Sequence, residues 1–306
     1  MVKDFLSLAD YTGEEILAFL DFADRLKAEV RAGTPHPLLQ GKTLALIFEK
    51  PSLRTRLTFQ IGMFQLGGHT VLIDDILGRR ESVPDVARNL ERWVDGIMAR
   101  TYRHAHVVEL ARCARIPVIN ALTDLLHPCQ ILADAQALRE HKGRDLGSLK
   151  VAFVGDGNNV FHSWANFAAR VPLNLTLVCP PGYEGDAEIT ARVRREAKGE
   201  FTITHDVEAG LRDADAVYTD VWASMGQEEE AETRERAFAP YQVNAALMAL
   251  AKPDALFMHC LPAHRGLEVT DDVIDGPQSV VFDEAENRLH AQKAVLATLL
   301  AAPANT

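Results

Sequence analysis

The sequence predicts an α/β protein with two doubly wound parallel-sheet domains joined by interdomain helices. Short apolar runs alternate along the chain with segments whose apolar residues recur at helical spacing. This alternation of strands and helices is typical of parallel sheets that are covered by helices on both faces. The 306 residues, 47% of them hydrophobic, are enough for two domains of ordinary size.

Residues 1–140 are expected to form the first domain. A capping-box pattern from Thr12 to Glu15 starts a helix over 16–30. Apolar runs predict strands over 43–48, 69–73, 96–99 and 117–120. Between them we expect a helix that ends at Gly67, one capped by Ser82, and one over 107–114. The predicted core faces of the first two are Leu57, Ile61 and Phe64, and Val86, Leu90, Trp93 and Val94.

Residues 141–284 are expected to form the second domain, after a polar connection over 141–150. Apolar runs predict strands over 151–154, 173–178, 201–204, 216–219, 255–258 and 280–282. A last helix over 285–301 is long enough to cross back, so residues 285–306 are expected to complete the first domain.

The charge and the cysteines narrow the class of protein. The net charge is −11 and the pI about 5.5, which argues against a general nucleic-acid-binding surface. No apolar run approaches the length of a membrane span, and the first residues do not read as a signal peptide. The four cysteines show no paired spacing, so a cytoplasmic location without disulfides is expected.

The stretch from Ser52 to Arg56 is a candidate anion site. It lies between a predicted strand and a predicted helix, where backbone N–H groups and the helix dipole favour a negative charge. Arg54 and Arg56 add guanidinium groups that suit phosphate oxygens. The same residues would also fit a solvated first helical turn.

Three polar positions follow predicted strands in the first half. Arg54, Arg100 and His127 each come just after an apolar run. Because ligands of open parallel sheets bind beyond the carboxyl ends of the strands, we expect the three side chains to share one rim.

A glycine pattern follows the predicted strand 151–154. Gly155 and Gly157 are similar to the start of a dinucleotide-binding fingerprint, but Phe161 and His162 stand where its third glycine belongs. A nucleotide-binding oxidoreductase therefore stays a less favoured alternative.

Seven motifs in this order closely resemble those of the ornithine carbamoyltransferases over nearly the whole chain. They are Ser52-Leu53-Arg54-Thr55-Arg56, Arg100-Thr101-Tyr102, His127-Pro128-Cys129-Gln130, Gly155-Asp156-Gly157-Asn158-Asn159, Asp220-Val221-Trp222-Ala223-Ser224-Met225-Gly226, His259-Cys260-Leu261-Pro262 and Asn287-Arg288-Leu289-His290. The first three resemble the wider carbamoyltransferase family, and the Ser-Met-Gly and His-Cys-Leu-Pro motifs point to ornithine.

The resemblance implies transfer of the carbamoyl group of carbamoyl phosphate to the δ-amine of L-ornithine, which gives L-citrulline and phosphate, in arginine biosynthesis or a catabolic route. It implies that Thr55, Arg100 and His127 are donors to the carbonyl oxygen, and that Gln130 holds the carbamoyl nitrogen. The implied carbamoyl-phosphate site is Ser52, Leu53, Arg54, Thr55, Arg100, His127, Gln130 and Arg288.

The resemblance also implies an ornithine site with Asp220 at the α-ammonium and Cys260 at the δ-amine. The implied set is Asn159, Asp220, Ser224, Met225, Cys260 and Leu261, and the implied catalytic residues are Arg100, His127, Thr55 and Cys260. No metal and no organic cofactor are expected, and the implied assembly is a homotrimer or a multiple of one.

Two positions depart from the family pattern. Leu53 stands where a threonine is usual, which removes a hydroxyl but leaves a backbone N–H. Ile76 stands where a glutamine is usual, and Arg79 or Arg80 could supply charge instead.

The remaining alternatives are another acceptor amine (aspartate, putrescine or an N-acylornithine) and a non-catalytic binding protein on the same fold. For single residues, His127 could merely cap a turn and Cys260 could be a small core residue.

Overall fold

The computed structural model describes residues 2–223 and 230–301. Ser224 and Met225 therefore lie outside the described residues. The chain divides into two compact units: unit 1 comprises Met1–Gln136 and Glu286–Thr306, and unit 2 comprises Ala137–Ala285. Within the described ranges, no helix combines the length and the apolar character that a membrane crossing needs.

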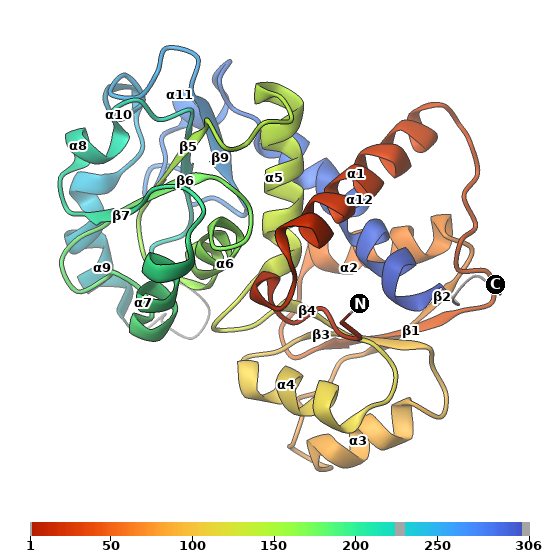
Figure 1. Ribbon diagram of the computed structural model, residues 1–306. Helices are drawn as coiled ribbons and strands as arrows, with labels where there is room; N and C mark the ends of the chain where they lie inside the picture. The colour runs from red at the N-terminus through yellow and green to blue at the C-terminus, as the bar shows by residue number, and fades with distance from the viewer. Residues whose placement is uncertain (1, 224–229, 302–306) are drawn as a thin grey trace. The chain divides into compact units, whose positions relative to one another are not determined.

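Unit 1 is built on a four-stranded parallel sheet in the order β2-β1-β3-β4. Its helices cover both faces, with α3 and α4 on one side and α1, α2 and α12 on the other (Figure 1). Gly62 lets α2 approach α12, because a Cβ there would lie 3.2 Å from Cγ of Lys293. The elements are η1 (Leu8–Asp10), α1 (Gly13–Arg31), β1 (Thr43–Phe48), α2 (Leu53–Gln65), β2 (His69–Ile73), α3 (Val83–Leu90), β3 (Gly96–Arg100), α4 (His104–Cys113), β4 (Val118–Leu122), and most of α5 (Pro128–Lys142) and of α12 (Val281–Leu300). The last residues of α5 and the first residues of α12 belong to unit 2.

Unit 2 is built on a five-stranded parallel sheet in the order β7-β6-β5-β8-β9. Phe161 and Trp164 of α6 pack against Phe153 and Tyr218 of the sheet. The elements are β5 (Lys150–Val154), α6 (Asn159–Ala168), β6 (Asn174–Val178), α7 (Ala187–Glu196), β7 (Phe201–Thr204), α8 (Val207–Leu211), β8 (Ala216–Thr219), α9 (Ala231–Phe238), η3 (Ala239–Tyr241), α10 (Ala245–Met248), β9 (Leu256–His259) and α11 (Asp271–Ile274).

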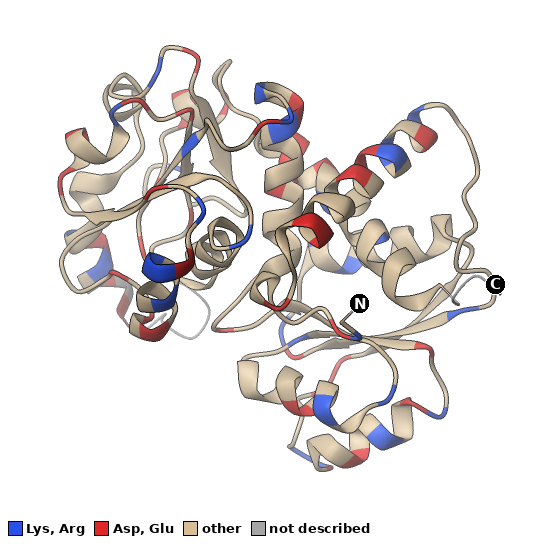
Figure 2. Cartoon of the chain, in the orientation of Figure 1, with Lys and Arg blue, Asp and Glu red and all other residues tan. Residues whose placement is uncertain are grey.

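The strands are almost free of charge, as Figure 2 shows. Of the residues in these nine strands, only Arg100 and Lys150 are charged at neutral pH. The strand order reverses between β1 and β3 in unit 1, and between β5 and β8 in unit 2. Ligands of open α/β sheets bind at such reversals, beyond the carboxyl ends of the strands. Arg100 is the last residue of β3, at the reversal in unit 1. Its charge is unusual for a residue of these strands, and its position suits a bound ligand.

The predicted fold class is confirmed, since both sheets are parallel and carry interleaved helices. The predicted core face of α2 is wrong. Leu57, Ile61 and Phe64 are 45%, 42% and 81% exposed, whereas Phe59 and Met63 are fully buried. Helical spacing identified an apolar stripe correctly, but α2 carries apolar residues on two sides, and the packing of α12 selects the other one.

Two further predictions are wrong. Trp93 was expected in the core and is 71% exposed, because α3 ends at Leu90 and the chain turns before it. Residues 280–282 were predicted as a strand, but α12 begins at Val281. Such a short apolar run does not distinguish a strand from the first turn of a buried helix.

Candidate functional site

The turn from β1 into α2 presents an anion-binding helix start. Ser52 is the N-cap residue of α2, but its side chain makes no capping hydrogen bond. Its hydroxyl therefore does not bond the first N–H groups of the helix. Leu53 opens the helix and is 71% exposed, while Thr55 is buried. Beside the turn lies a hollow of about 480 Å³ that Ser52, Leu53, Arg56 and Ile76 help to line.

Arg288 of α12 reaches the same helix start. Its Nη2 donates to Oγ1 of Thr55 at 3.1 Å, and its Nη1 donates to Oε1 of Gln130 at 2.5 Å. The amide oxygen of Gln292, oriented by its hydrogen-bond network, accepts from Nε of Arg288 at 3.1 Å. Asp134 accepts from Nε2 of Gln130 at 2.7 Å, which directs the amide oxygen of Gln130 toward the guanidinium. Arg288 is 2% exposed, and uncharged oxygen acceptors bond the separate nitrogens of its guanidinium.

His127 lies directly before α5, and it is 4% exposed. Burial and the charges of Arg288, Arg100 and Arg54 hold the pKa of its imidazole well below the usual value. At neutral pH the ring is therefore uncharged and can donate one N–H. Arg288 bonds Thr55 at the start of α2 and Gln130 at the start of α5, so these two helix starts meet at one guanidinium in unit 1. That Arg54, Arg100 and His127 share this site stays a prediction.

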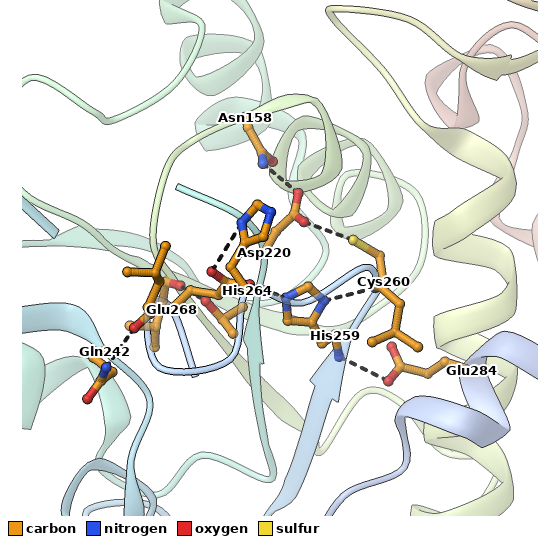
Figure 3. Close-up of polar contacts among 12 residues, drawn as sticks. Asn158, Asp220, Gln242, His259, Cys260, His264, Glu268 and Glu284 are labelled. Atoms are coloured by element: carbon orange, nitrogen blue, oxygen red, sulfur yellow. Dashed lines mark hydrogen bonds and ion pairs between the residues drawn. The ribbon is translucent and has the colours of Figure 1, made fainter. Parts of the chain in front are cut away.

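Asp220 follows β8 in unit 2 and is held on both carboxylate oxygens. Nδ2 of Asn158 donates to Oδ2 at 2.7 Å, and Sγ of Cys260 donates to Oδ1 at 3.0 Å (Figure 3). Oδ1 of Asn158 in turn caps α6 by accepting from the N–H groups of Val160 and Phe161. Asp220 is 7% exposed, so it presents a buried negative charge suited to an ammonium group.

The segment after β9 holds Cys260 and Leu261 in a fixed conformation. Leu261 has a φ of 55°, and its N–H donates to Nδ1 of His259 at 2.8 Å. Because Nδ1 accepts, the proton lies on Nε2, which faces Oε1 of Glu268 at 3.2 Å (Figure 3). Both side chains are buried, and the N–H of His259 donates to Oε2 of Glu284 at 3.1 Å. These bonds fix where the thiol of Cys260 and the carbonyl of Leu261 lie.

Arg234 of α9 connects the start of that helix to the loop after β5. Its Nη1 donates to Oδ2 of Asp156 at 2.8 Å and to the carbonyl of Trp222 at 3.0 Å. Burial raises the pKa of Asp156 to about 6, although Arg234 acts in the opposite direction. The pair therefore ties the segment after β8 to the loop that carries Asn158.

Among the described residues, Asp220, His259 and Cys260 bring possible metal-ligand atoms within 4.8 Å of one another. Each already has a hydrogen-bond partner in the chain: Asp220 accepts from Cys260 and Asn158, and His259 bonds Leu261 and Glu268. The arrangement is thus explained by hydrogen bonding, and the chemistry proposed below uses no ion.

Asn159, the remaining predicted ornithine residue, opens α6 and is 8% exposed. Sequence reasoning missed Asp134, Gln292, Arg234 and Glu268. Asp134 lies one helical turn after Gln130, so its contact could have been inferred from spacing. Gln292 likewise lies one helical turn after Arg288 on α12. Arg234 and Glu268 contact residues of other segments, and no local pattern predicts those contacts.

An arginine at a strand end, arginines on α2 and α12 and a buried, uncharged histidine, all in a doubly wound parallel-sheet unit, suit a protein class that binds a small anionic ligand. The comparisons specify the family. Residues 3–140 match the family model described as "Aspartate/ornithine carbamoyltransferase, carbamoyl-P binding domain", and residues 147–299 match its "Asp/Orn binding domain". The chain belongs to the aspartate/ornithine carbamoyltransferase family.

Similar proteins carry a more specific name. A Thermococcus kodakarensis protein named ornithine carbamoyltransferase is 52% identical over 304 residues, which covers 97% of this chain and 96% of that one. A Pyrococcus furiosus protein named as the anabolic ornithine carbamoyltransferase is also 52% identical, with the same coverage. The solved ornithine carbamoyltransferase from Pyrococcus furiosus superimposes with a TM-score of 0.93 at 52% identity and covers 97% of both chains.

Proposed function

We propose that the protein transfers the carbamoyl group of carbamoyl phosphate to the δ-amine of L-ornithine, giving L-citrulline and phosphate in arginine biosynthesis. The observation that carries the proposal is that the buried Arg288 bonds Thr55 at the start of α2 and Gln130 at the start of α5, where the buried, uncharged imidazole of His127 directly precedes the helix. Such a cluster suits a dianionic phosphate beside a carbonyl that gains negative charge during attack.

Unit 1 holds the carbamoyl donor in this proposal. The N–H groups of the Ser52–Thr55 turn, including that of Leu53, and the guanidinium of Arg54 bind the phosphate. Arg100, His127 and Thr55 donate to the carbonyl oxygen, and Arg288 adds positive charge. Gln130 holds the carbamoyl nitrogen, because Asp134 keeps its amide oxygen turned toward this cluster. The leaving phosphate stays bound by the same groups, so binding and chemistry use one cluster.

Unit 2 holds the amino acid. Asp220 pairs with the α-ammonium through its buried carboxylate, so we expect an acceptor whose α-amine is acylated to bind poorly. Cys260 and the carbonyl of Leu261 orient the δ-amine, and Asn159, Ser224 and Met225 contact the amino-acid end. The neutral δ-amine attacks the carbonyl carbon and forms the new C–N bond. The bond to phosphate breaks, and the leaving phosphate takes up the proton that the attacking nitrogen loses, with no acyl-enzyme and no cofactor.

We also propose a cytoplasmic homotrimer, or a multiple of one, with domains over 1–140 with 285–306 and over 141–284. The exposed stripe of α2, formed by Leu57, Ile61 and Phe64, supports an assembly, because an exposed apolar patch on a folded unit marks an interface. Ile76, at 42% exposure, and the 74–81 segment stand beside the anion turn, where a second subunit would reach the site.

The function is tested by supplying carbamoyl phosphate with L-ornithine, aspartate, putrescine and N-acetylornithine in turn, and measuring phosphate release together with the carbamoylated product. We expect turnover with L-ornithine to exceed that with each other amine by at least about a hundredfold. Preference for N-acetylornithine, which has no free α-ammonium, would contradict the role of Asp220. Preference for putrescine, which keeps that amine but lacks the carboxylate, would contradict L-ornithine as the acceptor. Failure with every amine would favour the non-catalytic alternative, and reduction of a nicotinamide cofactor would favour the oxidoreductase.

A further inference from the structure

Glu49 is a buried carboxylate in unit 1 to which the proposed chemistry assigns no task. It lies between the end of β1 and the anion turn, and its side chain is 1% exposed. Oε2 accepts the N–H of Tyr102 at 2.7 Å, and Oε1 accepts the N–H of Leu77 at 2.9 Å. Burying a charge is costly unless it is hydrogen-bonded, and these bonds to a charged acceptor are of the stronger kind.

The backbone of Glu49 holds the same neighbour. The backbone N–H of Glu49 donates to the carbonyl of Arg100 at 3.0 Å. Two residues later along that chain, the N–H of Tyr102 donates to the side chain of Glu49. Glu49 thus binds the chain on both sides of Thr101, directly after Arg100.

The strand carrying Arg100 is irregular at this point. The pairing of β3 with β4 shifts between Ala99 and Arg100, so that Arg100 pairs with Leu122. An irregularity of this kind redirects the side chains of the strand end and needs other contacts to hold it. The bonds from Glu49 supply such contacts on the β1 side of β3, and the N–H of Thr101 donates to the carbonyl of Leu122 on the other side.

We propose that Glu49 is a positioning residue for the carbamoyl donor: its carboxylate sets Arg100, and with it the 74–81 segment, against the Ser52–Thr55 turn. The inference rests on the proposed function. Glu49 lies three residues before Ser52, so one side chain links the anion turn to the two segments that flank it. A carboxylate is required because two N–H groups need two acceptor oxygens. A glutamine would place an NH₂ group against one of them.

The test compares Glu49→Gln and Glu49→Asp with Glu91→Gln in the full-length protein. Glu91 is a matched control, because its side chain is 6% exposed and also accepts a backbone N–H, that of Arg115 at 2.8 Å, before the amino end of β4. Each variant is assayed for kcat, for the KM of both substrates, for competitive inhibition by inorganic phosphate, and for Tm.

For Glu49→Gln we expect the KM for carbamoyl phosphate and the inhibition constant of phosphate to rise about tenfold or more, and kcat to fall. The reason is that moving a binding group by about 1 Å can lower the rate by about a hundredfold. The KM for L-ornithine stays within about twofold, and Glu49→Asp shows the same pattern more weakly. Glu91→Gln lowers Tm without changing any kinetic constant.

Three results would overturn the inference: Glu49→Gln with a lowered Tm and unchanged kinetics, an equal loss of affinity for both substrates, or failure of both Glu49 variants to fold while Glu91→Gln folds. The last result would give Glu49 a role in stability alone. An unaltered protein that lacks carbamoyl transfer would instead refute the proposed function, so the two failures are distinguishable.

Discussion

Replacing Arg288 by lysine tests whether the guanidinium fork, and not its charge alone, is needed. Arg288 bonds Thr55, Gln130 and Gln292 from a position 2% exposed to solvent. A lysine keeps the charge but presents one ammonium point, which cannot reach acceptors on three sides. Hydrogen bonds to charged groups contribute about 1.5–3 kcal/mol each, so losing one or two should destabilise unit 1 by about 3 kcal/mol.

That loss corresponds to a fall in Tm of about 6–12 °C for a domain of this size. Activity should fall more steeply, because one misplaced donor to a developing negative charge costs about 10²–10³-fold in kcat. A thermal melt measures the fall in Tm, and phosphate release with L-ornithine measures the loss of activity.

The control for Arg288→Lys is Arg170→Lys in unit 2, where Nη1 of Arg170 bonds Oε2 of Glu196 at 2.7 Å on a partly exposed face. It should lose little stability and no activity. If Arg288→Lys retained turnover within about threefold, the positive charge alone would be sufficient. That result would refute the need for the planar guanidinium at this position.

Three further outcomes are expected. Arg54→Ala should lose activity by about 10²-fold or more while keeping the far-UV circular dichroism of the unaltered protein, and near-normal turnover would contradict the anion site. Phe64→Glu should reduce the assembled mass in sedimentation analysis, because it charges the exposed stripe of α2, whereas an unchanged mass would place the interface elsewhere. Burial and the charge of Lys293 lower the pKa of His290 to about 3, so the unfolded chain binds a proton below pH 6.5 that the folded chain does not. Stability should therefore fall by about 2 kcal/mol between pH 6.5 and 4.5, and His290→Gln should flatten that slope of Tm with pH; an equal slope would refute the assignment.

Local features of the sequence were sufficient for most elements. Strands over 43–48, 69–73, 201–204 and 216–219 were predicted with their observed limits, and the caps at Thr12 and Ser82 lie where their side chains accept backbone N–H groups. These succeed because apolar runs and capping bonds act within a few residues of one another. The wrong core face of α2 shows the limit, since spacing finds apolar stripes but not the element that covers them.

The sequence by itself determined the fold class, the family and the residue types of the candidate site, because these are written in patterns of neighbouring residues and in the order of motifs. Only the tertiary structure decided that Arg288, more than 230 residues after Thr55, donates to its hydroxyl, and that burial leaves His127 uncharged. It also decided that Glu49 accepts the N–H of Tyr102, just after Arg100, and that the N–H of Leu261 sets the tautomer of His259. Such contacts arise where strand order and helix packing bring together segments that are far apart in the sequence. Patterns of neighbouring residues therefore do not predict them.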